Sequence, residues 1–278
     1  MSIQSAVSYG HVGNSAAVFP LQCLGHEVWP VNTVQFSNHA GYETFGGTAM
    51  AAADIADIVD GLEARGLFPR CRAVLSGYLG TLENGAVIAD AVRRVKQANS
   101  KAVYCCDPVI GDSAEGIYVG EGIADFIRTE LAPVADILTP NKFELNLLTG
   151  RTADSEKELV NNAQTLIAQG TTIVAITSLV TPQPKDIATM VVTKDEAWRI
   201  TTPLLSLKAK GTGDVFAALL LGHVLDGLPP SKALNKTCSA LFQAIEKTSE
   251  NDAQELLLVE NRAVFGAAYE RFAAERIF

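Results

Sequence analysis

A short glycine-rich turn in this chain places one carboxylate directly before an apolar run. Gly211-Thr212-Gly213 is followed by Asp214, and residues 215–222 predict a buried helix that begins at the turn. Unpaired backbone N–H groups and the helix dipole favour an anion at such a start, and glycines leave those groups accessible. Asp214 could then accept a proton from a hydroxyl while the amides hold developing charge. This suits phosphoryl transfer from a nucleotide to an alcohol, although an Asp-capped helix after a turn fits equally well.

Two common glycine patterns for nucleotide binding are absent from the sequence. No run matches glycine, four residues and then Gly-Lys-Ser or Gly-Lys-Thr. Phe216 stands where the dinucleotide pattern needs a third small residue. A nucleotide site in this chain therefore needs another scaffold.

Two acids elsewhere are placed to bind a cation. Asp107 follows an apolar strand and precedes Pro108, and Glu144 lies on the first turn of a helix opened by Pro140 and Asn141. Mg²⁺ prefers oxygen ligands and keeps several waters, so one or two carboxylates plus phosphates would suffice. A strand-end cap for Asp107 and a dipole-favoured first-turn acid for Glu144 are the structural alternatives. The four glycines of residues 111–122 are typical of a mobile lid or of a surface loop.

The elements that must position these residues alternate along the chain. Seven apolar runs predict strands, an eighth short strand is expected over residues 1–5, and segments of helical periodicity separate them. The expected strands are Val28–Val34, Ala73–Ser76, Ala102–Cys105, Ile137–Leu138, Ile173–Ile176, Thr189–Val192 and Ala197–Ile200. The expected helices are Asn14–Leu24, Ala49–Arg65, Glu83–Asn99, Gly122–Leu131, Lys142–Leu148, Ser155–Gln169, Gly213–Leu225, Ser231–Thr248 and Glu255–Ala274.

This alternation predicts an α/β fold with a central, mostly parallel sheet and helices on both faces. Residues 188–193 and 196–200, joined by a Lys-Asp turn, predict one hairpin. Neither a repeat nor a linker divides the sequence, so we expect a single domain over residues 1–278. Ligands of such sheets collect where strands end. Polar turns follow several expected strands, at Ser5, residues 10–14, Gly77-Tyr78, Asp107-Pro108 and residues 139–141.

Composition limits the classes of partner. The 278 residues are 48% hydrophobic and 19% charged, as in a well-cored globular protein, and carry a net charge of −9. That charge argues against binding to nucleic acid or to an anionic membrane, and an ATP site would need metal ions and backbone amides. Five cysteines without C-x-x-C spacing favour reduced thiols in a cytoplasmic protein over a zinc site. No apolar run reaches the length of a membrane span.

Taken together and in order, these segments resemble the ribokinase-like superfamily, and within it the pyridoxal kinases. The similarity spans residues 2 to about 245. Gly-Thr-Gly-Asp is a signature of the superfamily only, whereas Asn-Thr-Val-Gln-Phe-Ser-Asn-His at residues 32–39 is much more specific to pyridoxal kinases. The matching segments are residues 2–5, 10–21, 31–39, 75–78, 106–112, 139–144 and 211–214.

The resemblance implies ATP-dependent phosphorylation of the 5′-hydroxymethyl group of pyridoxal, pyridoxine or pyridoxamine. Asp214 would be the catalytic base, and Gly211, Thr212 and Gly213 would form the anion hole. The vitamer would contact Ser5, Val12, Phe36, His39, Ala40, Tyr78 and Asp214, with Ser5 bonded to the pyridine ring. ATP would be bound by Asp107, Tyr118, Asn141, Glu144, Thr177, Ser178 and Thr212. Mg²⁺ and a monovalent cation would lie near Asp107, Asp112, Thr139, Glu144 and Thr177, with Asp112 and Tyr118 in the lid.

By the same resemblance we expect a homodimer. The chain departs from the family pattern at Ala40, where Thr is usual, and at Phe45, where Trp is common. Two other functions fit the residues. One is another small-alcohol kinase of the superfamily, such as a hydroxymethylpyrimidine kinase. The other is a non-catalytic protein that binds a vitamer, for which a base beside an anion site has no use.

Overall fold

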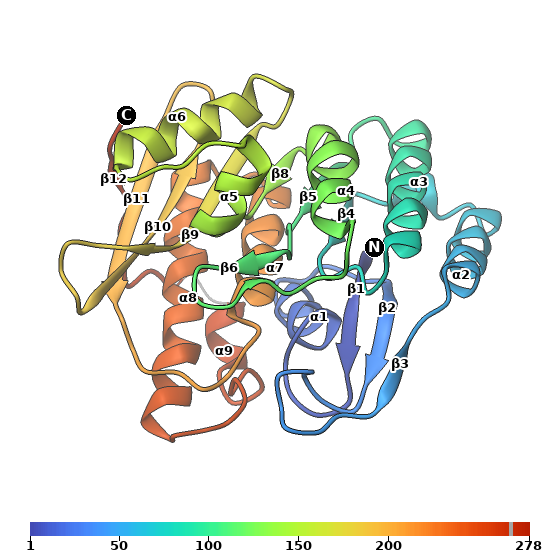
Figure 1. The fold of residues 1–278 in the computed structure, drawn as a ribbon, viewed down its shortest axis with the longest axis horizontal. Helices are drawn as coiled ribbons and strands as arrows, with labels where there is room; N and C mark the ends of the chain where they lie inside the picture. Colours follow the sequence, from blue (N-terminus) through green and yellow to red (C-terminus); the bar gives the residue numbers. More distant parts are fainter. Residues whose placement is uncertain (267–268) are drawn as a thin grey trace.

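The computed structural model describes residues 1–266 and 269–278 of the chain. Its main feature is a ten-stranded sheet with the order β12-β11-β10-β9-β8-β5-β4-β1-β2-β3 (Figure 1). The six strands from β9 to β2 are parallel to one another, and β3, β10, β11 and β12 pair antiparallel. The bounds are β1 Ser2–Val7, β2 Pro30–Phe36, β3 Gly47–Ala49, β4 Ala73–Ser76, β5 Val103–Cys106, β8 Ile137–Leu138, β9 Ile173–Val180, β10 Asp186–Val192, β11 Ala197–Pro203 and β12 Glu275–Arg276.

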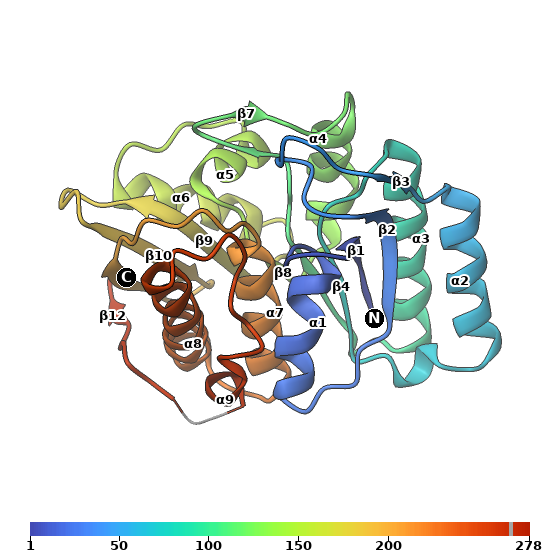
Figure 2. The ribbon, with the colours of Figure 1, turned by 90° about the horizontal axis from the view of Figure 1, so that it is seen from below.

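Helices cover both faces of this sheet, as Figures 1 and 2 show together. One face packs against α1, α7 and α8, with α9 against α1 and α8, and the other face packs against α2 to α6. Neighbouring residues of one strand, such as Val74 and Leu75, belong to opposite cores because side chains alternate along a strand. The bounds are α1 Asn14–Cys23, α2 Ala52–Ala64, α3 Leu82–Ala98, α4 Ile123–Phe126, α5 Lys142–Thr149, α6 Glu156–Ile167, α7 Thr212–Leu225, α8 Pro230–Glu250 and α9 Arg262–Phe265.

The predicted fold class is confirmed, and so is the hairpin, which β10 and β11 form. The first strand runs to Val7 and is buried at all six positions, two residues beyond the expectation. The predicted helix over Gly122–Leu131 is divided, since α4 ends at Phe126 and a π-helical turn follows over Ile127–Leu131. Three short pairings were not predicted. They are β3 beside β2, β12 beside β11, and a separate two-stranded sheet of β6 (Gly111–Asp112) and β7 (Gly116–Ile117).

The predicted C-terminal helix over Glu255–Ala274 is wrong. Apart from residues 267–268, which lie outside the described part, only Arg262–Phe265 is helical there. The segment packs along α8, whose side chains accept its backbone N–H groups in place of helical carbonyls. Ser239 Oγ accepts from Arg271 and Phe272, and Asn235 Oδ1 accepts from Ala274.

Two further expectations concern the state of the cysteines and the presence of membrane-spanning helices. All five cysteines lie among the described residues and are free thiols, as the sequence predicted. None of the described helices combines the length and apolar character that crossing a lipid bilayer requires.

Candidate active site

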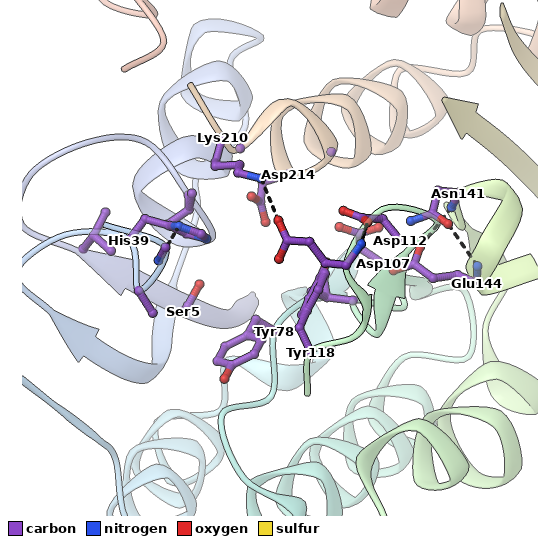
Figure 3. A pocket seen from close by; sticks show the side chains of 18 of the residues that line it. Ser5, His39, Tyr78, Asp107, Asp112, Tyr118, Asn141, Glu144, Lys210 and Asp214 are labelled. Atoms are coloured by element: carbon purple, nitrogen blue, oxygen red, sulfur yellow. Dashed lines mark hydrogen bonds and ion pairs between the residues drawn. The ribbon is translucent and has the colours of Figure 1, made fainter. Parts of the chain in front are cut away.

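A pocket of about 530 Å³ opens where the parallel strands end, and it contains nearly all of the predicted site residues (Figure 3). Thr212 alone among them is not part of its wall. At one end the wall comes from β1, β2 and the loops that follow them, and at the other from β9 and the loops after β5 and β8. The predicted residues in the wall are Ser5, Val12, Phe36, His39, Ala40, Tyr78, Asp107, Asp112, Tyr118, Thr139, Asn141, Glu144, Thr177, Ser178, Gly211, Gly213 and Asp214.

The start of α7 forms the middle of this wall. Gly211 has φ 91°, and a Cβ there would lie 1.8 Å from the carbonyl oxygen of His11, so only glycine lets the two loops approach. Among the described residues no N-cap side chain bonds this helix start, at which the first backbone N–H groups also lack helical acceptors. Burial raises the pKa of Asp214 to about 6, and the backbone N–H groups of Gly13 and Asp214 oppose the shift. At neutral pH the carboxylate is therefore ionised and can accept a proton.

Asp107 and Thr139 form a buried pair beside Asp214. Thr139 Oγ1 donates to Asp107 Oδ1 at 2.7 Å, and both side chains are buried. Burial, followed by the charges of Asp214 and Glu144, raises the pKa of Asp107 well above its usual range. Two neighbouring carboxylates thus disfavour the ionised form of Asp107, and a bound cation would relieve that repulsion.

Glu144 belongs to the capping box that begins α5. Its backbone N–H donates to Asn141 Oδ1, and its Oε2 accepts from the N–H of Asn141, both at 2.9 Å. Glu144 Oε1 accepts from the N–H of Ile110 at 3.0 Å, and Asn141 Nδ2 donates to the carbonyl of Gly111 at 2.8 Å. Burial raises the pKa of Glu144 to about 7 against these backbone bonds. The capping box thus ties α5 to the loop after β5.

These oxygens fit a cation that also binds phosphate. Within residues 1–266 and 269–278, no three His, Cys, Asp or Glu side chains form a preformed metal cluster. Asp112 Oδ1 accepts the N–H groups of Ala114 and Glu115 in its own turn. Of the predicted cation-site acids, Asp107 has no such backbone bond, so its carboxylate could hold a cation such as Mg²⁺, which needs few carboxylates when phosphates complete its shell.

The opposite end of the pocket is less charged. Val12 is buried, and Phe36 and Tyr78 are half-buried. Gly13 brings the α1 loop against Ser5, because a Cβ there would lie 2.2 Å from Ser5 Oγ. His39 Nδ1 accepts the N–H of Gly41 at 3.0 Å, and burial followed by Lys210 lowers the pKa of His39. This end can hold a neutral, flat ligand with a few polar atoms.

Thr177 and Ser178 belong to β9 and line the end of the pocket that contains Asp107 and Glu144. The strand pairs irregularly with β10 between Ala188 and Met190, and Ser178 there has φ 57°, which is rare for a residue with a Cβ. The N–H of Thr177 donates to the carbonyl of Pro140 at 3.0 Å. Residues held in this region cluster at ligand sites, where the rest of the fold sustains the strain.

Sequence reasoning missed two charged residues that meet in the pocket wall. Lys210 Nζ lies 3.5 Å from Glu115 Oε1, joining the turn between β6 and β7 to the residue before the glycine turn. Burial, followed by the charge of Glu144, raises the pKa of Tyr118, which directly follows β7. The position of Lys210 directly before Gly211 was a usable signal, whereas the partner of Glu115 depends on the fold.

The described geometry has known counterparts. The family model "Phosphomethylpyrimidine kinase" matches residues 65–256. A pyridoxal kinase PdxY of Corynebacterium diphtheriae is 45% identical over 279 residues, covering 100% of this chain and 99% of its own, and one of Granulibacter bethesdensis is 47% identical over 271 residues, covering 95% of each chain. Pyridoxal kinase of Leishmania donovani with ADP and pyridoxine superposes with a TM-score of 0.92 at 29% identity, covering 100% of this chain and 98% of that one. Pyridoxal kinase of Entamoeba histolytica with PLP gives 0.89 at 27%, covering 99% and 98%.

The two sequence comparisons carry different names and cover different parts of the chain. The family model begins at residue 65 and leaves out the segment that contains Ser5, Val12, Phe36, His39 and Ala40. The curated relatives match the chain along its whole length, including that segment. Since those residues form the less charged end of the pocket, the full-length matches are more informative about the substrate.

Proposed function

The chain belongs to the pyridoxal kinase family, and on that premise we propose that it transfers the γ-phosphoryl group of ATP to the 5′-hydroxyl of pyridoxal. The products are pyridoxal 5′-phosphate and ADP. The observation that carries the proposal is the placement of Asp214 on the uncapped first turn of α7, between the two ends of one pocket. A hydroxyl bound at the less charged end would meet a phosphate bound at the other end beside that carboxylate.

Asp214 is the proposed general base. It takes the proton of the hydroxyl as the oxygen attacks phosphorus, and its pKa of about 6 leaves it ionised at neutral pH yet able to hold the proton. The amides of Gly211, Thr212 and Gly213 lie at the positive end of the helix dipole. They stabilise the charge that develops on the transferred phosphoryl oxygens. Ser5 is the proposed hydrogen-bonding partner of the pyridine ring.

Asn141, Glu144, Thr177 and Ser178 support the nucleotide in this proposal, and the β6–β7 lid with Tyr118 covers it. When bound, Mg²⁺ neutralises phosphate charge that a chain of net charge −9 cannot neutralise with basic side chains alone. Its proposed ligand is Asp107, oriented by Thr139, and a monovalent ion would lie toward Thr177. The homodimer stays a prediction from resemblance.

Phosphorylation of a hydroxymethylpyrimidine is a second candidate, because the matching family model carries that description. Both substrates are flat heterocycles with a primary alcohol, so the same machinery around Asp214 could serve either. Specificity would then come from the less charged end of the pocket.

A coupled ADP-release assay with a panel of alcohols tests the proposal. Pyridoxal, pyridoxine, pyridoxamine and hydroxymethylpyrimidine are each supplied with Mg²⁺ and ATP, and the phosphorylated product is identified by mass. We expect the highest kcat/KM for a B6 vitamer. A higher value for the pyrimidine would assign the second function, and vitamer binding without turnover of any alcohol would contradict both.

A further inference from the structure

Glu255 lies outside the pocket wall, yet its carboxylate contacts two loops that enclose the less charged end of the pocket. Because the vitamer is proposed to bind at that end, we call it the vitamer end. Glu255 Oε2 accepts the backbone N–H of His11 at 3.1 Å, and Oε1 accepts the hydroxyl of Tyr42 at 2.5 Å. His11 is in the turn after β1, and Tyr42 is in the loop after β2, so three segments far apart in sequence meet at one side chain. In Figure 1 the chain that follows α8 runs beside these N-terminal loops.

The loop of residues 38–46 depends on this contact for its position. Asn38 Nδ2 donates to the carbonyl of Thr44 at 2.9 Å, and the N–H of Gly46 donates to Ser37 Oγ at 2.8 Å. In the described part of the chain, the Tyr42–Glu255 bond is the one hydrogen bond that joins this loop to a distant segment. Because the same loop supplies three residues to the pocket wall (His39, Ala40 and Gly41), its position sets the shape of the vitamer end.

The turn of residues 8–13 packs closely against the same carboxylate. Gly10 has φ 93°, and a Cβ there would lie 2.4 Å from the Cδ of Glu255, so glycine is needed for the close approach. Val12 of this turn lines the pocket, and the carbonyl of His11 lies against Gly211. The rings of Tyr9 and Tyr42 also meet edge to face, with centroids 6.5 Å apart.

The backbone around Glu255 is held by core packing and by a hydrogen bond to α8. The next residue, Leu256, and Leu258 are 1% and 0% exposed and belong to the core beneath α8. The N–H of Leu257 donates to Thr248 Oγ1 of α8 at 3.1 Å. The carboxylate is therefore a rigid support for the two loops that it contacts.

We propose that Glu255 is a positioning residue for the vitamer: it holds loop 38–46 and turn 8–13 in the arrangement that binds the substrate alcohol. The inference rests on the proposed function of the pocket. Glu255 acts through Tyr42 and His11, and it takes no part in binding ATP or in proton transfer. Its loss should weaken binding of pyridoxal and leave the chemical step almost unchanged.

Steady-state kinetics of four single variants test this. Glu255→Ala should raise the KM for pyridoxal about 3- to 30-fold, less than the roughly 10- to 150-fold of a charge-assisted hydrogen bond lost to the ligand itself, because the direct contacts of the vitamer remain. The KM for ATP and kcat should stay within about twofold. Tyr42→Phe should give part of the effect, since it removes only the loop contact. Glu255→Gln should recover most of the wild-type KM, because its amide can accept from His11 and donate to Tyr42. Glu260→Ala, an exposed acid in the same segment, is the matched control and should match wild type.

A double variant and hydrogen exchange distinguish failure of the proposed role of Glu255 from failure of the proposed function. Tyr42→Phe combined with Glu255→Ala should be no worse than Glu255→Ala, because both remove the same tether. Hydrogen exchange in the absence of ligands should be faster across residues 38–46 in Glu255→Ala, but unchanged in β4 and β5. If wild type phosphorylates pyridoxal and both Glu255→Ala and Tyr42→Phe keep its KM, the role of Glu255 is wrong and the function stands. A fall in kcat at constant KM would also overturn it. If wild type phosphorylates no vitamer, the proposed function itself fails, and faster exchange would still establish the tether.

Discussion

Ala40 is a residue at which the resemblance to the pyridoxal kinases leads us to expect another side chain. It lies in the pocket wall, in the loop that Tyr42 joins to Glu255. The resemblance implies Thr at this position, and a Thr hydroxyl could donate to or accept from a polar atom of the ligand. The missing group makes Ala40 a direct probe of which atoms the vitamer contacts.

We predict that Ala40→Thr lowers the KM for pyridoxal. One restored hydrogen bond contributes about 0.5–1.5 kcal/mol, which corresponds to a factor of roughly 2 to 12 in KM. Turnover should barely change, because uniform binding leaves the chemical step as it was. The measurement is kcat and KM for pyridoxal and pyridoxine. An unchanged KM for both vitamers in a folded variant would place the vitamer away from Ala40.

At the residue scale, local signals were sufficient where chemistry follows a strand or a turn directly. Asp107, Asn141 and Asp214 were recognised because each stands within two residues of an element boundary. Glu255 could not be recognised, since 244 residues separate it from His11 and nothing near it in sequence indicates the contact. A contact of this kind follows from the path of the whole chain.

At the scale of elements, short polar signals predicted helix starts better than periodicity predicted helix length. Asn141 and Ser155 each precede a glutamate by three residues, and both form complete capping boxes. The stretch after residue 255 has apolar residues at helical spacing but folds along α8. Periodicity alone does not distinguish an amphipathic helix from an irregular segment whose backbone bonds to a neighbouring helix.

The two capping boxes provide a matched pair of variants. Asn141→Ala and Ser155→Ala should each lower the free energy of unfolding by about 0.5–2 kcal/mol, the usual loss for an N-cap. Only Asn141→Ala should also raise the KM for ATP, because Asn141 lines the pocket and bonds to Gly111. Urea unfolding and steady-state kinetics measure the two effects. A raised KM for ATP in Ser155→Ala would mean that general loss of stability explains the kinetic change.

At the scale of the whole molecule, an acidic protein concentrates carboxylates where it must bind an anionic nucleotide. Asp107, Glu144 and Asp214 all have raised pKa values, through burial first. From about pH 4 upward, the folded state therefore holds protons that the unfolded chain releases, and the free energy of unfolding falls as the pH rises through about 6 to 7.

The single domain over residues 1–278 remains a prediction.

This linkage predicts a pH-dependent effect of Mg²⁺ in the absence of nucleotide. At pH 8 Glu144 and Asp214, whose pKa values are about 7 and about 6, are ionised and disfavour a further negative charge on Asp107, so Mg²⁺ should raise the Tm more at pH 8 than at pH 5.5. Each kcal/mol of relief is worth about 2–4 °C in proteins of about this size.

Asp107→Asn is the control for that experiment, because its side-chain oxygen can still accept from Thr139. Without metal at pH 8, the Tm of this variant should be higher than that of wild type. The rise in Tm caused by Mg²⁺ should be smaller than in wild type. Thermal unfolding followed by circular dichroism with and without Mg²⁺ measures both. An equal increment at the two pH values, or an undiminished one in Asp107→Asn, would show that the ion binds elsewhere.

The central claim, that Asp214 removes the proton of a vitamer hydroxyl during phosphoryl transfer, is tested most directly by the Asp214→Asn variant. Its rate of pyridoxal 5′-phosphate formation is measured at saturating pyridoxal and Mg²⁺-ATP, and ATP affinity is measured separately by calorimetry. Removal of a general base predicts a loss of roughly 10²- to 10⁴-fold in turnover, with ATP binding largely kept because the amides of the glycine turn remain. Turnover close to that of wild type, in a folded variant that binds both substrates, would contradict the account.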